Sequence, residues 1–281
     1  MSQVNPARRS FLSGGLKRAD QRSHLARRLS REMQGQVYVD AASRGRYATD
    51  ASIYQVMPIG VVVPKTDLDA RIALDIARDL NVPVLPRGAG TSQCGQTVGE
   101  ALVIDNSKYL RTMLDLDLEA MTVTVQPGMV LDHLNAQLKP HGVWFPVDVS
   151  TSAQCTIGGM TGNNSCGSRS LYYGNMVHNV AGIDAVLADG TQAYFGLFGD
   201  GGDMTLGNAR MNGLIPQLFQ IAESVKEDIT AVWPRVMRRV GGYNLDVFYP
   251  QSERPYLPER QQGLVNFAHL LVGSEGPLAY F

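Results

Sequence analysis

The fold is decided by the stretch IGVVVPKTDLDARIALDIARDLNVPVLPRGAGTSQCGQ, residues 59–96. Its β-branched start, residues 59–63, predicts a strand, and Thr66 with Asp69 three residues later predicts the capped start of a helix. Residues 82–85 predict the next strand, so the stretch forms a βαβ unit that ends in a glycine-rich loop. One apolar face of the helix is expected to be formed by Leu68, Ile72, Ile76 and Leu80.

A second glycine-rich stretch, TIGGMTGNNSCG, occupies residues 156–167. Successive Gly, Ser and Thr residues allow main-chain N–H groups to converge on an anion without interference from Cβ atoms. One such loop is weak evidence for a ligand. Two of them predict a long cofactor that is held at both ends and has a diphosphate in the middle.

Most of the remaining signals are antiparallel. Asp189-Gly190 after the apolar run 183–188 predicts a hairpin, and residues 214–232 repeat apolar side chains at helical spacing. We predict an α+β fold with two lobes, a small lobe that contains the βαβ unit and a larger, mainly antiparallel lobe. Further strands are expected at 36–39, 101–105 and 122–125 and a helix at 130–138, and the buried stripe of the long helix should consist of Leu218, Ile221, Val225, Ile229 and Val232.

Composition limits the classes of function. The chain has 281 residues, 44% of them hydrophobic, and a formal net charge of −1, which gives no reason to expect nucleic acid or an anionic membrane as a partner. No apolar run reaches the length of a membrane-spanning helix. Cys94, Cys155 and Cys166 form no CxxC pair, so we expect no metal or iron–sulfur site in this chain and a reducing, cytoplasmic location.

Residues 1–36 form a basic N-terminal extension. Arg8-Arg9 is superficially similar to a twin-arginine export signal, but the polar residues 13–18 stand where an apolar segment is required. We therefore interpret the extension as a solvated helical segment that packs on a neighbour or on parts of the protein outside this sequence.

Neither of two other nucleotide-binding motifs is complete in this sequence. A dinucleotide-binding G-x-G-x-x-G motif would need a glycine where Gln93 stands, although Asp105 lies at a suitable distance for a ribose-binding acid, and this reading is less favoured. A P-loop would end in Gly-Lys-Ser or Gly-Lys-Thr, and neither tripeptide occurs in the sequence. Nucleoside-triphosphate chemistry is therefore not expected.

Ordered sequence blocks carry a family resemblance. The segment Tyr47–Tyr54 with Asp50, the run 58–64, the two glycine-rich stretches, Tyr173-Gly174, Leu187–Gly190 and Gly273–Gly276 resemble the FAD-binding domain of the vanillyl-alcohol oxidase and p-cresol methylhydroxylase (PCMH) type. The resemblance extends from about Val37 to the C-terminus. The sequences of residues 163–170 and of Gly242–Leu245 resemble the D-lactate and D-2-hydroxyglutarate dehydrogenase branch, whose large members are fused to an iron–sulfur module.

The resemblance implies which residues contact each part of a bound FAD. Residues 87–96 would wrap the diphosphate through main-chain donors, residues from 146 to 167 would line the isoalloxazine ring and ribityl chain, Tyr173-Gly174 and residues 180–183 would close over the adenine, and Glu275 would lie near the end of the cleft. Because Thr91 stands where some relatives carry a flavin-linking histidine, FAD is expected to be non-covalent. The implied set comprises Arg87, Gly88, Ala89, Gly90, Thr91, Ser92, Gly95, Gln96, Pro146, Asp148, Ser152, Thr156, Gly158, Gly159, Asn163, Gly167, Tyr173, Gly174, Val180, Ile183 and Glu275.

Structural roles remain open for some of this set. Gly158 and Gly159 could permit tight packing, and Asp148 and Asn163 could be turn residues. Arg169 could bind a substrate carboxylate, although a structural role is favoured, and His133 is expected on a solvated helix face.

The implied reaction is hydride transfer from a D-2-hydroxy acid to flavin N5, with electrons passing to an acceptor or iron–sulfur module outside this chain. No catalytic residue is assigned. We expect residues 37–281 to be the FAD-binding domain and the chain to stop before a C-terminal substrate domain, with Pro277 in place of the usual threonine. The alternative is a non-catalytic FAD-binding module or electron-transfer subunit that a partner chain completes.

Overall fold

The computed structural model describes residues 21–198, 209–234, 236, 238–248 and 265–281. The chain divides into two compact units, Met1–Leu110 and Arg111–Phe281, and each is described by itself.

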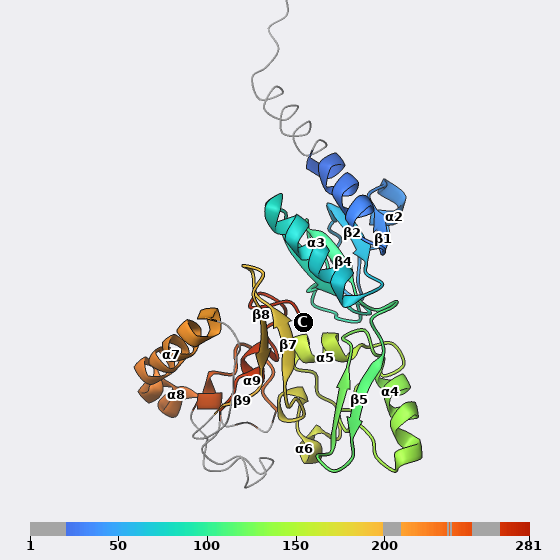
Figure 1. Ribbon diagram of the computed structural model, residues 1–281. Coiled ribbons are helices and arrows are strands. Elements are labelled where there is room, and N and C mark those ends of the chain that lie inside the picture. Colours follow the sequence, from blue (N-terminus) through green and yellow to red (C-terminus); the bar gives the residue numbers. More distant parts are fainter. Residues whose placement is uncertain (1–20, 199–208, 235, 237, 249–264) are drawn as a thin grey trace, which may run out of the picture. The chain divides into compact units, whose positions relative to one another are not determined.

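Unit 1 is built on a four-stranded sheet with the order β1-β2-β4-β3 (Figure 1). β2, β4 and β3 are parallel, and β1 pairs with β2 in the antiparallel direction. Every residue of β2 and β4 is buried, which explains their continuous apolar runs. β4 lies between β2 and β3, so the predicted βαβ unit crosses over a strand that comes later in the chain. The strand bounds are β1 Gln36–Tyr38, β2 Gly60–Val63, β3 Val84–Arg87 and β4 Leu102–Asp105.

Helix α3, Asp67–Asp79, connects β2 to β3 and covers one face of the sheet (Figure 1). Its predicted cap is confirmed, because the Thr66 side chain accepts a hydrogen bond from Asp69 N. The predicted position of Leu68 on the apolar face is wrong, since this side chain is 56% exposed. Asp69 is buried instead and accepts hydrogen bonds from two main-chain N–H groups, which rotates the face toward Ala70, Ala73, Ile76 and Ala77.

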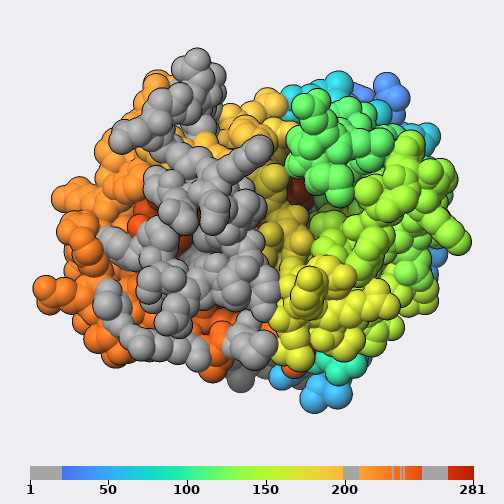
Figure 2. All heavy atoms as spheres, turned by 90° about the horizontal axis from the view of Figure 1, so that it is seen from below, coloured from blue at the N-terminus to red at the C-terminus, as the bar shows by residue number. Residues whose placement is uncertain are grey.

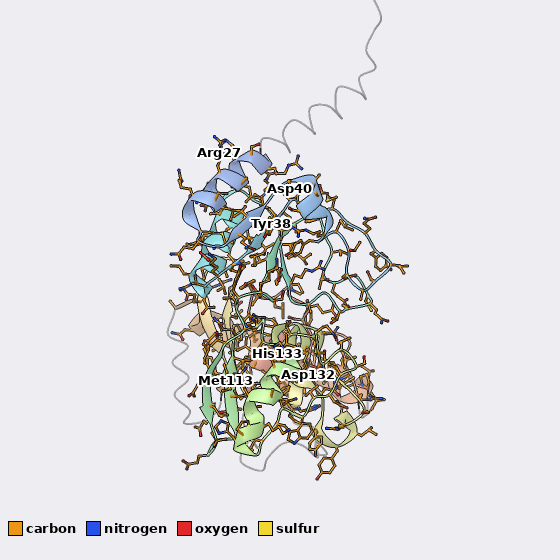
Figure 3. All side chains as sticks on the ribbon, turned by 90° about the vertical axis from the view of Figure 1, so that its right-hand side faces the viewer. Arg27, Tyr38, Asp40, Met113, Asp132 and His133 are labelled. Atoms are coloured by element: carbon orange, nitrogen blue, oxygen red, sulfur yellow. The ribbon has the colours of Figure 1, made fainter. Side chains whose placement is uncertain are left out.

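Residues 21–32 form a helix that packs into unit 1. Leu25 and Leu29 are fully buried, and Arg28 Nη1 lies 2.9 Å from Asp79 Oδ2 on α3. This part of the extension is therefore not the solvated segment that its charge suggested, because its apolar side turns inward while Arg27 projects outward (Figure 3). The domain boundary at residue 36 stays a prediction.

Unit 2 begins with the antiparallel pair β5, Met113–Asp117, and β6, Thr122–Val125. Helix α4, Leu131–Leu138, packs on this hairpin through Leu134 and Leu138, while Asp132 and His133 lie on its exposed side (Figure 3). The prediction for His133 is therefore confirmed. β5 was not anticipated, because alternating Leu and Asp side chains on an exposed strand give a weak apolar signal.

The rest of unit 2 surrounds one large core. The hairpin predicted at Asp189-Gly190 is confirmed as β7, Ile183–Val186, paired with β8, Gln192–Phe195. The rings of Phe198, Phe219 and Phe248 all pack against Phe267 or against one another with centroids 5.3–5.8 Å apart. The other elements of the two units are α2 Ala41–Gly45, η1 Lys139–His141, α5 Ile157–Asn163, α6 Ser170–Tyr173, η2 Met176–His178, β9 Leu197–Phe198, α7 Ala209–Ser224, α8 Lys226–Val232, η3 Leu245–Phe248, β10 Val265–Asn266 and α9 Ala268–Leu271.

The long helix predicted at 214–232 is two helices, α7 and α8, separated at Val225. The predicted buried stripe is wrong at Val232, 75% exposed, and at Ile221, 53% exposed, because α7 buries the face of Met211, Ile215 and Ala222 and Ile221 lies outside it. The buried positions are Met211, Ile215, Ala222 and Ile229.

The predicted α+β class and the division into a βαβ-containing part and a mainly antiparallel part are confirmed. None of the helices in the described ranges combines the length and the hydropathy that crossing a bilayer requires.

A pair of Leu→Ala substitutions tests whether the helix of residues 21–32 belongs to the core of unit 1. Leu29→Ala should lower the free energy of unfolding by about 2–4 kcal/mol, because it empties a fully buried site. Leu68→Ala, in the exposed control position of α3, should change it by about 0.5 kcal/mol or less. Urea denaturation followed by circular dichroism measures both, and equal effects would contradict the packing of this helix.

Candidate functional site

The first glycine-rich loop begins where β3 ends in unit 1. Within the described part of the chain, none of the six consecutive main-chain N–H groups from Gly88 to Gln93 donates a hydrogen bond to the protein. Cys94 N resumes local bonding by donating to Ser92 Oγ at 3.3 Å. These residues are half-buried or exposed, so their N–H groups are open to water or to a ligand, and a run of such donors is suited to an anionic ligand.

Two glycines in this loop adopt a backbone conformation that other residues avoid. Gly90 has φ +69° and Gly95 has φ +83°. A Cβ atom at Gly90 would lie 2.6 Å from Nη2 of Arg87, and one at Gly95 would lie 2.6 Å from the ring of Tyr54. Backbone conformation and space both require glycine at these two positions.

The side chain of Arg87 holds the segments next to the loop together. Its guanidinium donates to three main-chain carbonyls, at 2.8 Å for Thr49 and at 3.2 Å for Tyr47 and Thr97. Burial lowers the pKa of Arg87, while the nearby carboxylates of Asp105 and Asp50 raise it. Since the donors of Arg87 are directed into the fold, its predicted contribution to ligand binding reduces to its main chain.

Neighbouring side chains hold the two ends of the loop. Asp50 Oδ2 accepts a hydrogen bond from Thr97 Oγ1 at 2.9 Å, and its Oδ1 accepts one from Ser52 N at 2.8 Å. Burial acts to raise the pKa of Asp50, but these hydrogen bonds outweigh it and hold that pKa below its ordinary value. The side chains of Ser92 and Gln96 contact each other across the loop.

The second glycine-rich stretch does not form an anion-binding loop. Residues Ile157–Asn163 form helix α5, capped by Thr156. Its first N–H groups already have partners: Ile157 N donates to Met129 O and Gly158 N to Pro127 O, both at 2.8 Å, and Gly159 N donates to Thr156 Oγ1 at 3.3 Å. The prediction of a second anion-holding loop is therefore wrong. A Cβ at Gly158 would lie 2.6 Å from Pro127 Cβ, so close packing explains this glycine.

Asp148 organises the turn at residues 167–169. Its Oδ2 accepts from Ser168 Oγ at 2.8 Å and its Oδ1 accepts from Arg169 N at 3.0 Å. A Cβ at Gly167 would lie 1.5 Å from the carbonyl oxygen of Asp148. These contacts give both residues a structural role, whatever they contribute to a ligand.

An aromatic cluster lies beside this turn. The guanidinium of Arg169 lies 5.2 Å from the ring centroid of Trp144, and Tyr173 packs edge-on against Trp144 with centroids 5.2 Å apart. The structural role favoured for Arg169 is thus supported. Figure 2 shows the segment that follows α4 meeting the segment around α6 at the surface of unit 2. Sequence reasoning missed Trp144, because no local motif links it to a segment so much later in the chain.

The structure joins Glu275 to α5. Gly273 N donates to Thr161 O and Glu275 N donates to Gly162 O, both at 2.9 Å. Glu275 and Asn163 are exposed there, and Ser165 Oγ donates to Asn163 Oδ1 at 3.4 Å. Two predicted blocks that are far apart in sequence therefore meet at one end of a short helix.

The remaining predicted residues have varied environments. Pro146 and Ser152 are half-buried, and Ser152 O accepts from Asp132 N at 3.1 Å. Gly174 has φ +78° and no room for a Cβ beside His178, whose Nδ1 accepts from Asn175 N at 2.9 Å. Val180 O accepts from Asn266 Nδ2 at 3.2 Å, and the Ile183 side chain is buried in the core.

Two buried asparagines were not in the predicted set. Asn164, with φ 52°, ends α5 and accepts from Val177 N at 3.0 Å. Asn244 Nδ2 donates to His269 O at 2.9 Å and to Val272 O at 2.8 Å. The sequence motifs that contain them are the asparagine pair 163–164 and the segment Gly242–Leu245. These motifs do not distinguish structural from ligand-binding roles. No group of three or more His, Cys, Asp or Glu side chains in the described ranges is placed to hold a metal ion.

Comparison with known proteins identifies the family that this chain matches. Residues 58–196 match the family described as FAD binding domain. D-2-hydroxyglutarate dehydrogenase of Pseudomonas putida is 33% identical over 260 residues, and that of Haemophilus influenzae is 32% identical over 260 residues. Each alignment covers 88% of this chain and 24% of the relative. The chain thus spans about a quarter of the length of these curated relatives.

Two solved structures share the fold. Alkyldihydroxyacetonephosphate synthase superimposes with a TM-score of 0.54 at 22% identity, over 59% of this chain and 36% of that chain. Physcomitrella patens BBE-like 1 superimposes with a TM-score of 0.53 at 20% identity, over 60% of this chain and 37% of that chain. The family match, the relatives and the shared fold agree with the resemblance seen in the sequence blocks. The chain therefore belongs to the FAD-binding domain family of the vanillyl-alcohol oxidase superfamily, and its cofactor is FAD.

Proposed function

We propose that this chain is the FAD-binding part of a dehydrogenase that oxidises a D-2-hydroxy acid, with D-2-hydroxyglutarate and D-lactate as candidate substrates. The observation that carries the proposal is the run of free N–H groups from Gly88 to Gln93 in unit 1. The alignment of 88% of the chain with proteins named D-2-hydroxyglutarate dehydrogenase supports this substrate class.

The proposed role of the first glycine-rich loop is to hold the FAD diphosphate. Its N–H groups are neutral donors, and the charge of Arg87 is engaged by carbonyl oxygens beneath the loop. The loop therefore recognises phosphate oxygens through the orientation of its N–H groups more than through net charge. Thr91 and Ser92 add hydroxyl groups, while Gly95 and Gln96 close the loop.

Unit 2 is proposed to contact the remaining parts of FAD. The exposed residues Gly159, Asn163 and Glu275 at α5, with the turn held by Asp148, are candidates to line the isoalloxazine ring and ribityl chain. Tyr173 and the main chain from Val180 to Ile183 are candidates for the adenine side. Ile183 can contribute only its main chain, because its side chain is buried in the core.

When bound, FAD supplies a hydride acceptor at flavin N5, and the protein supplies binding and orientation. No catalytic residue is assigned, and we propose that the electron acceptor, or an iron–sulfur module, lies outside this chain. A cytoplasmic location is part of the same proposal. The alternative, a non-catalytic FAD-binding module completed by a partner chain, predicts FAD binding without flavin reduction by a hydroxy acid.

FAD should be held without a covalent bond, because Thr91 offers no side chain that links to flavin. Acid precipitation of the yellow protein should release all the flavin into the supernatant. Flavin absorbance that remains with the denatured polypeptide would contradict the non-covalent assignment.

Gly90→Val should weaken FAD binding by roughly a hundredfold, since the new side chain meets both an unfavourable φ and the Arg87 guanidinium. Gly45→Val is the matched control, because nothing lies within 4 Å of a Cβ at Gly45. Quenching of flavin fluorescence measures the dissociation constants, and circular dichroism checks the fold. Equal FAD affinity in the two variants would remove the diphosphate assignment from this loop.

Anaerobic mixing with substrate tests the activity itself. With residues 1–281 alone, the flavin absorbance band should stay unchanged, because we assign no residue of this chain to orient a hydroxy acid against the flavin. When the chain is joined to a substrate-binding part, the band should bleach with D-2-hydroxyglutarate or D-lactate and stay unchanged with the L-enantiomer. Bleaching by residues 1–281 alone would show that the catalytic groups lie in this chain, and no bleaching by either D-acid in the joined protein would favour the alternative of a non-catalytic module.

A further inference from the structure

Tyr47 and Asp105 form a buried polar pair in unit 1. Tyr47 is 8% exposed and Asp105 is 3% exposed, and Tyr47 Oη donates to Asp105 Oδ2 at 2.7 Å. The other carboxylate oxygen of Asp105 accepts from Ser107 N at 2.9 Å and Ser107 Oγ at 2.6 Å. A buried carboxylate with three donors is held in one orientation.

Asp105 lies beside the start of the diphosphate loop. It is the last residue of β4 and pairs in register with Arg87, the last residue of β3. Asn106 N donates to Arg87 O at 3.0 Å. The carboxylate and the first loop residue are therefore fixed at the same end of neighbouring strands.

Tyr47 contacts Arg87 in two ways. Its carbonyl accepts from Arg87 Nη1 at 3.2 Å, and its ring centroid lies 5.4 Å from the guanidinium carbon. The guanidinium in turn lies against Gly90, where a Cβ would be 2.6 Å from Nη2. An unbroken series of contacts thus runs from Asp105 through Tyr47 and Arg87 to the middle of the loop.

We propose that Tyr47 and Asp105 are positioning residues for the FAD diphosphate, which act through Arg87 to hold the N–H groups of Gly88 to Gln93 in their binding arrangement. The inference rests on the proposed function, because it takes this loop as the diphosphate site. Neither side chain needs to touch FAD. Loss of the Tyr47 hydroxyl would release the ring and carbonyl on which Arg87 rests, and the loop donors would lose their alignment.

The same substitution at a neighbouring tyrosine provides the control. Tyr38, labelled in Figure 3, lies on β1, and its hydroxyl donates to Gln36 Oε1 at 2.8 Å. Its carbonyl and ring make no contact with Arg87 among those found in the described residues. Tyr38 packs near Tyr47, so Tyr38→Phe and Tyr47→Phe each remove one hydroxyl from the same region, and only the Tyr47 hydroxyl bonds to Asp105.

FAD affinity and phosphorus NMR of bound FAD test the inference in the full chain. Tyr47→Phe should raise the dissociation constant for FAD roughly tenfold, the effect of one lost charge-assisted hydrogen bond, while Tyr38→Phe should change it less than about twofold. The two phosphorus resonances of bound FAD should move in Tyr47→Phe and stay in place in Tyr38→Phe. A purely structural role would leave those resonances unchanged.

Asp105→Asn provides a second variant that preserves the shape of the side chain. It should weaken FAD binding as Tyr47→Phe does. The double variant should bind FAD about as tightly as the weaker-binding single variant, because both changes break the same interaction. Wild-type affinity and unshifted resonances in both single variants would overturn the inference. If Gly90→Val still weakened FAD binding as predicted, the diphosphate assignment would survive that result; if it did not, the proposed function would fail separately.

Discussion

The guanidinium of Arg87 is the contact on which the binding loop depends. It joins three main-chain carbonyls from two segments, so the loop between them can leave its own N–H groups unpaired. Main-chain groups that are buried without a partner cost free energy, whereas those of this half-exposed loop stay open to water or a ligand. The protein itself thus holds the loop in place, and the buried carboxylate of Asp105 and the half-buried carboxylate of Asp50 lie near the Arg87 charge that holds it.

The two glycine-rich stretches show that similar composition can serve different purposes. In the first, Gly90 is needed for its backbone conformation and its neighbours keep free donors. In the second, Gly158 is needed so that a helix can approach Pro127, and the helix donors are already used. Composition predicts that the backbone comes close to something, but it does not say whether that is a ligand or another part of the chain.

Sequence reasoning succeeded where the signal was local. The Thr66 cap, the strands of unit 1 and the Asp189-Gly190 hairpin depend on neighbours within a few residues. It failed where long-range packing decides: α7 turns another face to the core and leaves Ile221 exposed, and Trp144 meets Tyr173 only in the folded chain. For the candidate site, the place of the first loop after β3 could be predicted, whereas the inward role of the Arg87 side chain and the contacts between Asp148 and Gly167 follow from no spacing rule.

The insertion of β4 between β2 and β3 also bears on how unit 1 forms during synthesis. A nascent chain that has released only β2, α3 and β3 holds two strands that are not neighbours in the final sheet, and the gap between them stays open until Leu102–Asp105 emerges. The parallel sheet therefore closes late and depends on contacts distant in sequence, which slows folding and leaves strand edges unpaired in the meantime. The glycine-rich loop leads from β3 toward that last strand, so both strands that flank it are paired only after β4 has entered the sheet.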